Sequence, residues 1–497
     1  MNNNSSSSSI RLKPFGQLES LSASAPWAIF PRKKLDVTYR DIGAGLAACL
    51  QLRERQRSEY EQKITKLWNS TGQTVVTLSI RYYMNGLNAN MTENDLITAF
   101  DLLLQTLKLP VGSEVLCSAI TIPDMMYVLR YHALVPVPVD VDPKTLAVNV
   151  KLLKEAVTDK TKMIVIAHIF GSRCPLDEVL EVARNHDLLV VEDCAQAFMG
   201  MQYTGENRAD VSMFSFGTIK TATSFGGAVI HVKNPVVLEE MRRRERRYPC
   251  HTNVSFFKKL MKYGVLHGIS TPALYGLFIH ACRAVGGVTI NRCCWCINIA
   301  DHDKVITSAI RGFSGGELVS LIQYRPSMAL LGLMHHRLTC IDEQYIRLRK
   351  SKSEQLATAI KDLPNVFVRF RVTMLRSTTI GCSLFVFRPR KKFGFRLLST
   401  DHVGVLERVL TSLPVLRSWL TCQGTIVGSI LFTFSLGRDH DPVHAKNIMA
   451  RSVATLYGSE LYFYSLVYLP VTPETPEWAI ERMTCCLRDA LRSSSRL

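Results

Sequence analysis

The sequence predicts an α/β protein, with a large domain built on a mostly parallel sheet sandwiched by helices and a smaller C-terminal α/β domain. From residue 114 onward, short β-rich runs alternate with stretches of helical periodicity. Several of these runs, such as residues 163–168, are almost continuously apolar, which is typical of parallel strands covered on both faces. The chain of 497 residues is also too long for one ordinary core.

The expected elements follow one another in a regular order. Apolar positions three and four apart predict helices over residues 39–67, 124–132, 152–157 and 176–185. Apolar, β-rich runs predict strands over residues 115–117, 135–141, 163–168, 188–192, 211–216 and 228–232. A long amphipathic helix over residues 326–360 then leads to strands at 366–372 and 382–387 and a terminal helix at 476–491.

These elements divide the chain into three parts. Residues 1–30 are rich in Ser and Asn and are expected to form a disordered tail. Residues 31–325 form the expected large domain, in which 250–325 is an atypical insertion. Residues 326–497 form the linker helix and the small domain.

The charge balance is strongly basic, with a formal net charge of +18. Basic runs at residues 242–247 and 388–392 are each typical of a solvated helix face or loop, although a basic surface also attracts anions such as phosphorylated metabolites. No zinc-finger spacing or RNA-binding aromatic signature accompanies the basic runs, so we do not expect a nucleic-acid partner.

The cysteines and the apolar stretches indicate a cytoplasmic protein without a membrane span. The 14 cysteines lack a disulfide pattern and the N-terminal tract is polar, so we expect reduced thiols. The cluster at residues 293–296 has no partner pair at zinc spacing, and we expect no metal. The apolar stretch 264–290 is interrupted by His267, His280 and Arg283, which leaves peripheral membrane contact through residues 255–290 as a minor alternative.

Three features that carry chemistry fall at the ends of expected strands. The strand over 188–192 runs into Asp193, and the strand over 211–216 contains Ser215 and leads to Lys220. Gly226 and Gly227 precede the next strand. Because ligands bind at the carboxyl edge of parallel sheets, we expect these residues to lie near one another.

Their types fit the needs of a pyridoxal phosphate cofactor. The cofactor aldehyde condenses with an amine, which Lys220 supplies. The pyridine nitrogen stays protonated opposite a carboxylate such as Asp193, and the phosphate binds hydroxyls such as that of Ser215 and free backbone N–H groups. Taken singly, the Asp is more often a helix cap, the Ser structural and the Lys solvated; the combination in this order favours the cofactor.

Together these residues resemble the DegT/StrS-type aminotransferases, a family of fold-type-I pyridoxal-phosphate enzymes. The resemblance implies a mostly parallel, seven-stranded-type sheet sandwiched by helices in the large domain. The resemblance is densest from residue 112 to residue 234. It includes the segments 118–121 (SAIT), 136–143 (PVPVDVDP), 167–171 (AHIFG), 192–197 (EDCAQA), 203–205 (YTG) and 213–216 (MFSF), the last leading to Lys220.

The resemblance implies a role for each matching residue. Lys220 would carry the cofactor as a Schiff base and shuttle the proton, and Asp193 would pair with the pyridinium nitrogen. Gln196 would lie near the phenolic oxygen, Ser215 would contact the phosphate and Thr121 would lie in the loop covering the ring. The family has Ser-Gly-Thr at its first phosphate-binding helix, where this chain departs, so Ser79 and Thr98 stay open as sources of the hydroxyl.

The resemblance also implies the activity and the partners. We expect a homodimeric aminotransferase that moves an amino group from an amino acid to a keto-sugar, with a nucleotide-linked sugar favoured. Ile122, Thr221 and the long segment 250–325 depart from the family pattern. They keep open a pyridoxal-phosphate-dependent dehydratase, a non-sugar aminotransferase and a catalytically silent binding or scaffold protein as alternatives.

Overall fold

The computed structural model describes most of the expected large domain and parts of the rest. The described residues are 35–50, 55–68, 76–78, 95–142, 145–169, 171–218, 220–277, 322–360, 366–368, 382–387 and 466–470, together with Glu477, Ile480, Glu481 and Thr484. Predictions for residues 1–30, Ser79, 293–296 and 388–392 lie outside this set, as does most of the expected terminal helix at 476–491.

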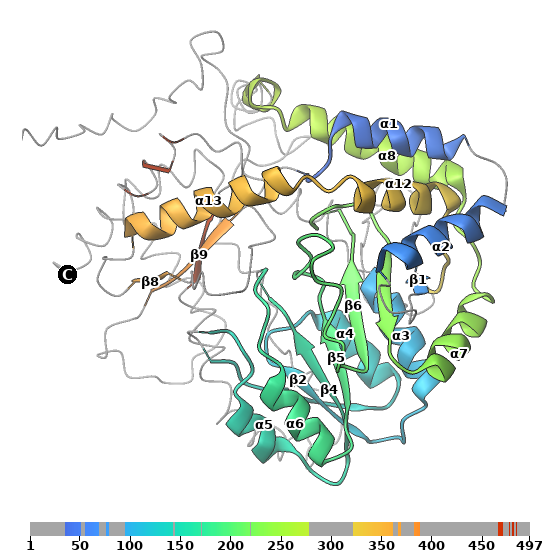
Figure 1. Ribbon diagram of the computed structural model, residues 1–497, viewed down its shortest axis with the longest axis vertical. Helices are drawn as coiled ribbons and strands as arrows, with labels where there is room; N and C mark the ends of the chain where they lie inside the picture. Colours follow the sequence, from blue (N-terminus) through green and yellow to red (C-terminus); the bar gives the residue numbers. More distant parts are fainter. Residues whose placement is uncertain are drawn as a thin grey trace, which may run out of the picture.

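A seven-stranded sheet forms the centre of the large domain (Figure 1), as the sequence predicts. Its order is β1-β7-β6-β5-β4-β2-β3, in which β3, β2, β4, β5 and β6 are mutually parallel and β7 is antiparallel to β6 and β1. The strands are β1 Val76–Leu78, β2 Glu114–Ser118, β3 Val135–Val139, β4 Thr161–Ala167, β5 Leu189–Asp193, β6 Val211–Ser215 and β7 Ala228–Val232.

Helices cover both faces of this sheet, and alternation along the strands divides the core between them. Val165 and Met213 point to a core shared with α3 Asp95–Leu107, α4 Pro123–Tyr131 and α7 Pro235–Glu245. Ile164 belongs to a core on the opposite face with α6 Asp177–Asn185 and α5 Val150–Ala156. This burial on both faces is why the strands read as continuous apolar runs.

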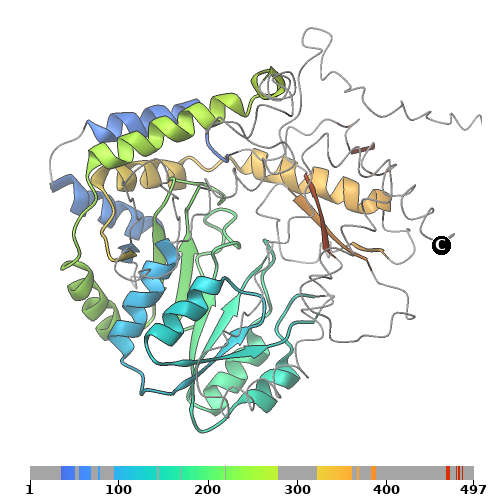
Figure 2. The same cartoon turned by 180° about the vertical axis from the view of Figure 1, so that it is seen from behind.

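A third cluster of buried residues lies where Phe214 and Phe216 meet a layer of four helices. These are α1 Tyr39–Cys49, α2 Arg55–Trp68, α8 Asn253–Ile269 and α12 Met328–Thr339. Trp68 stacks on Phe198 with 5.6 Å between the ring centroids, and Phe225 stacks on Tyr263 at 4.9 Å. In both views α1 and α8 run side by side along one end of the molecule, with α12 beneath them (Figures 1 and 2).

Two expected long helices are each divided in the structure, so the single-helix predictions over 39–67 and 326–360 are wrong in that respect. The first is α1 and α2, because α1 closes at Leu50. The second ends at Thr339 because Cys340 leaves the helical conformation at φ −108° and ψ 41°. A new helix, α13 Glu343–Ile360, starts after Asp342, whose carboxylate accepts a hydrogen bond from the backbone N–H of Tyr345 at 2.9 Å.

A second, three-stranded antiparallel sheet lies beyond α12 in the order β10-β9-β8. Its strands are β8 Val366–Val368, β9 Cys382–Phe387 and β10 Leu466–Pro470, and α13 lies alongside it (Figure 1). The boundary between domains at residue 325 stays a prediction. Within the described part of the chain, no helix combines the length and apolar character needed to cross a bilayer.

Candidate active site

The residues expected to carry chemistry gather at one edge of the sheet. Asp193 ends β5 and Ser215 ends β6, and these strands are parallel, so both residues lie at the carboxyl edge. Because β7 is antiparallel, its first residue, Ala228, pairs with Ser215 and brings Gly227 to the same edge. All three features therefore lie at the carboxyl edge of the sheet, as the sequence predicts.

Asp193 is a buried carboxylate with one short backbone contact. Its Oδ1 accepts a hydrogen bond from the backbone N–H of Ala195 at 2.9 Å, and its side chain is 6% exposed. Burial raises the pKa of Asp193, while the Ala195 N–H and the positive charge of Lys220 oppose that rise. Lys220 therefore acts electrostatically on this carboxylate.

Lys220 stands in a tight loop that joins β6 to β7. The loop turns back on β6, since the backbone N–H groups of Ser224 and Gly226 both donate to the carbonyl of Phe216. Ala222 and Phe225 adopt positive φ angles of 54° and 60°, a conformation that costs free energy in residues with a Cβ. Such a loop keeps its shape only if its surroundings hold it there.

The N-terminal segment and α12 hold this loop. The Asp36 carboxylate accepts the backbone N–H of Ala222 at 2.7 Å, and Arg337 on α12 donates to the carbonyl of Thr223 at 3.2 Å. Arg337 also donates to the carbonyl of Asp36 at 2.6 Å and to the carboxylate of Asp41 at 2.8 Å. Sequence reasoning missed this connection because its members lie about 300 positions apart and each reads as an ordinary surface charge.

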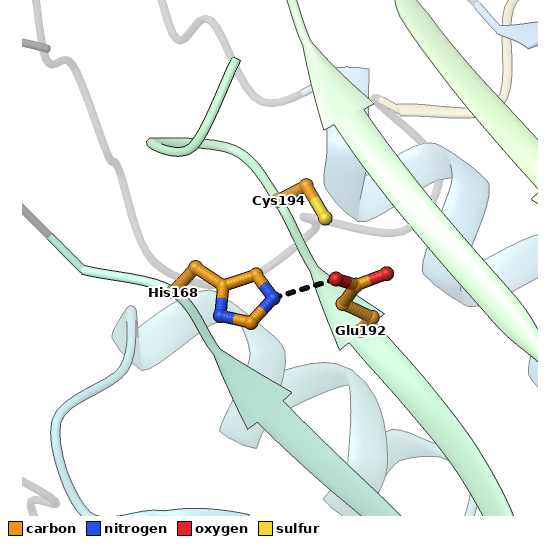
Figure 3. A group of neighbouring side chains, drawn as sticks. All are labelled: His168, Glu192 and Cys194. Carbon is orange, nitrogen blue, oxygen red and sulfur yellow. Dashed lines mark hydrogen bonds and ion pairs between the residues drawn. The ribbon is translucent and has the colours of Figure 1, made fainter. Parts of the chain in front are cut away.

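A hydrogen-bond network surrounds Glu192, the residue before Asp193, and Figure 3 shows its contact with His168. Nε2 of His168 donates to Oε1 of Glu192 at 2.6 Å, and both side chains are fully buried. The backbone N–H of Cys174 donates to Nδ1 of His168 at 3.0 Å, so the ring proton facing Glu192 is on Nε2. Tyr203 donates to the same Oε1.

The other carboxylate oxygen of Glu192 is equally engaged. Oε2 accepts from the hydroxyl of Ser212 at 2.6 Å and from the backbone N–H of Glu206 at 2.9 Å. Burial alone would raise the pKa of Glu192, but these bonds and His168 outweigh burial and lower that pKa. Glu192 is therefore a buried anion stabilised by four donors, one residue before Asp193. In the sequence, the signal for Glu192 is a charged residue at the end of an otherwise apolar strand.

The atoms of His168, Glu192 and Cys194 lie within 4.8 Å of one another, but they do not suit a metal ion. The Nε2 atom of His168 carries a proton and both oxygens of Glu192 accept hydrogen bonds. Burial and the neighbouring carboxylates raise the pKa of the Cys194 thiol, so it keeps its proton, whereas metal ligation needs a thiolate. The group is a hydrogen-bonded support for the end of β5.

The remaining predicted residues differ in how the structure accounts for them. Thr121 follows β2 and its buried hydroxyl has no hydrogen-bond partner among the described residues; the same holds for Thr221, beside Lys220. Gln196 is partly buried in the turn after β5. The hydroxyl of Thr98 donates to the carbonyl of Ile322 at 2.8 Å, so its proton is already used. Ser79 lies outside the described residues.

These residues fit pyridoxal phosphate. A buried carboxylate whose burial raises its pKa is stabilised by a cation, which a protonated ring nitrogen supplies. The unpartnered hydroxyls of Thr121 and Thr221 are polar groups that a ligand would satisfy, because buried polar groups are nearly always hydrogen-bonded. The amine of Lys220 lies on the same edge.

Solved structures of other proteins share this fold. The structure resembles that of the aminotransferase TlmJ from Streptoalloteichus hindustanus, with a TM-score of 0.54, 14% identity and coverage of 91% of this chain and 97% of that one. It also resembles the GDP-4-keto-6-deoxy-D-mannose-3-dehydratase of E. coli, solved with hydrated pyridoxal phosphate, at TM-score 0.53, 15% identity and coverage of 93% and 99%. The fold is therefore that of the fold-type-I pyridoxal-phosphate enzymes.

The sequence comparison matches part of the chain to a family model and to curated relatives. Residues 53–263 match the model of the DegT/DnrJ/EryC1/StrS aminotransferase family, which confirms the resemblance seen in the motifs. The GDP-perosamine synthase of Escherichia coli O157:H7 is 33% identical over 135 residues, 27% of this chain and 37% of the relative. That of Caulobacter vibrioides is 34% identical over 152 residues, 30% of this chain and 41% of the relative. The matched region thus spans about two-fifths of these relatives.

Proposed function

We propose that this protein is a pyridoxal-phosphate-dependent aminotransferase that moves an amino group from an amino acid to a keto-sugar, with a nucleotide-linked sugar as the favoured acceptor. The observation that carries the proposal is the position of buried Asp193 at the carboxyl edge of a fold-type-I sheet, where the positive charge of Lys220 acts on its carboxylate. The match of residues 53–263 to an aminotransferase family and the names of the sugar aminotransferases among its relatives support it.

Each residue has a chemical task in this proposal. Bound pyridoxal phosphate supplies an aldehyde and a ring that withdraws electrons from a substrate carbon. The Asp193 carboxylate keeps the proton on the ring nitrogen, which maintains that electron withdrawal. The Nζ of Lys220 accepts the proton from the substrate carbon and returns it. Gln196 and Thr121 position the ring, and Ser215 binds the phosphate. Ser79 is the second hydroxyl in this proposal, because the hydroxyl of Thr98 already donates to Ile322.

The network around Glu192 orients Asp193 in this scheme. Glu192 is anchored by four donors and fixes the end of β5, so the adjacent carboxylate holds one position without moving to meet the cofactor. The negative charge of Glu192 also raises the pKa of Asp193, which favours pairing with a cation. The network is therefore a positioning element for the ring-nitrogen contact.

We also propose a cytoplasmic homodimer, as the family resemblance implies. The cysteines of the described residues are free thiols, which fits a reducing compartment. Light scattering of the purified chain tests the dimer.

The central experiment is an absorbance spectrum of the purified full chain with pyridoxal phosphate. We expect a long-wavelength band that Lys220→Ala abolishes and that the matched variant Lys233→Ala, an exposed lysine at the end of β7, leaves unchanged. Adding L-glutamate alone should then bleach the band as the amino group transfers. A wild-type chain that binds no cofactor would contradict the proposal and favour the silent scaffold.

A second candidate reaction is dehydration, because one structural neighbour is a 3-dehydratase of a keto-sugar. Product analysis with a nucleotide-linked keto-sugar and glutamate separates the two. An amino-sugar product supports the proposal, whereas a deoxygenated sugar without incorporated nitrogen replaces it with the dehydratase.

A further inference from the structure

Helix α8 exposes an apolar face on the outside of the molecule. Five large apolar side chains recur along it at helical spacing, with a sixth beside them, all between 36% and 64% exposed. We call this set the α8 stripe: Val254, Phe257, Met261, Val265, Leu266 and Ile269. Leu274 and Leu277 extend it beyond the end of α8, at 50% and 49% exposure.

The α8 stripe is distinct from the face through which α8 packs on the protein core, because that buried face lies on the other side of the helix. Leu260 packs against α1, where a Cβ on Gly45 would approach its side chain to 2.9 Å. Tyr263 stacks on Phe225, and the His267 ring contacts that of Tyr39 at 4.9 Å. A helix that is apolar all round is normally covered all round, so the stripe needs a second partner.

The charges around α8 indicate what that partner is. From Arg246 to Leu277 the sequence contains five Lys or Arg residues and no Asp or Glu, and the next acidic residue is Asp301. Lys258 is exposed within the stripe, and Lys262 lies beside it. Apolar side chains interspersed with lysines and free of acids are typical of helices that lie on anionic lipid.

The same charges argue against a second copy of the chain as the occupant. A two-fold contact would bring a segment without acidic residues against itself, so Lys258 and Lys262 would meet like charges. A nucleic acid would match the lysines but would leave the apolar side chains in water.

We propose that the α8 stripe docks this protein on the surface of an anionic lipid bilayer. The apolar side chains insert among the acyl chains near the headgroups, and the two lysines contact lipid phosphates or carboxylates. The helix lies in the plane of the surface and does not cross it. This inference rests on α8 alone and does not depend on the aminotransferase activity.

The test is co-sedimentation of the full chain with vesicles of phosphatidylcholine with and without phosphatidylserine. We expect binding to the anionic vesicles that falls about tenfold or more in Phe257→Ser/Met261→Ser/Val265→Ser. The matched control, Val111→Ser/Tyr131→Ser/Val236→Ser, removes three apolar side chains elsewhere that are at least as exposed, and it should bind as the wild type does. Tm and cofactor absorbance of both variants report whether the fold is intact.

The contribution of charge is tested separately with Lys258→Glu/Lys262→Glu against Lys151→Glu/Lys154→Glu, which makes the same charge change on α5. We expect the first pair to lose binding to the anionic vesicles and the second to keep it. Equal binding to neutral and anionic vesicles, or none to either, overturns the proposal. A stripe variant that converts a dimer to a monomer, in a chain that does not bind vesicles, identifies the face as a contact between copies.

Discussion

Replacement of Glu192 by Gln tests whether the buried network holds the end of β5 as its geometry indicates. The side chain keeps its size, but one oxygen becomes an NH2 group. That group faces either Nε2–H of His168 or the backbone N–H of Glu206, and neither donor can become an acceptor. The chemistry of the neighbours thus leaves one buried donor unsatisfied in either orientation of the amide.

The magnitude follows from those contacts. One unsatisfied buried donor costs about 1–3 kcal/mol, and converting the remaining charge-assisted hydrogen bonds to neutral ones adds about 1–2 kcal/mol. We therefore expect Glu192→Gln to lower the free energy of unfolding by roughly 2–5 kcal/mol at pH 7, measured by urea titration followed by circular dichroism. Glu181→Gln, an exposed Glu-to-Gln change on α6, should stay within about 0.5 kcal/mol of the wild type.

The pH dependence gives an independent check. The pKa of Glu192 is lower in the folded protein than its ordinary value, so its ionised form contributes stability above that value. This contribution is lost as the pH falls through the folded pKa, and Gln has none to lose. The stability gap between wild type and Glu192→Gln should therefore narrow as the pH is lowered below about 4.5. A gap that is absent at pH 7, or that widens in acid, would refute the assigned hydrogen bonds.

Three further predictions concern the surroundings of the site. Gly205→Ala should lower the unfolding free energy by about 2–4 kcal/mol, because φ is +114° and the new Cβ would lie 2.4 Å from the Ser212 hydroxyl. The control is Gly43→Ala, whose new Cβ would have no atom within 4 Å. Equal losses of stability for the two variants in urea titration would contradict the prediction. Arg337→Ala should cost about 3–5 kcal/mol, because it removes the guanidinium beside buried Asp41 and leaves that carboxylate with Thr38 and His336. A Tm equal to that of the wild type would show that the pair is unimportant. Burial lowers the pKa of His251 to about 4, so the stability contributed by its neutral form is present above its unfolded pKa and is lost as the pH falls toward 4. In urea titrations, His251→Phe should reduce the stability that is lost between neutral pH and pH 4 by up to about 3 kcal/mol. An unchanged dependence of stability on pH would exclude the lowered pKa of His251.

Much of the large domain could be predicted because its strands are buried on both faces. The strand over 228–232 matches β7 at both ends, and the strand over 211–216 differs from β6 by one residue. Ends of helices were harder: the turn at Cys340 depends on the packing of α12 and on the Asp342 cap, and the apolar pattern runs through it. Strand β10 pairs with β9 across about 80 residues, a distance over which local pattern carries no information.

The residues of the candidate site also fall into two groups, those that the sequence could predict and those that it could not. The place of Asp193, Ser215 and Lys220 at one edge of the sheet was predictable, because each lies at the end of a buried strand or shortly after it. The residues that hold the loop around Lys220 were not predictable, because Asp36 contacts Ala222 and Arg337 contacts Thr223 only in the folded chain. The commitment of the Thr98 hydroxyl to Ile322 is likewise a tertiary fact. Chemistry at strand ends is local in sequence, whereas the groups that fix its geometry come from distant elements.

The Asp36 contact changes where the functional unit of this chain begins. The family match starts at residue 53, yet the carboxylate that fixes the turn after Lys220 lies 17 positions earlier. A version truncated to begin at residue 53 would keep the family match, but it would lose the hydrogen bond from Ala222 to Asp36 that holds the loop containing Lys220. Sequence variation in residues 35–50 therefore belongs with the site when natural variants of this protein are compared.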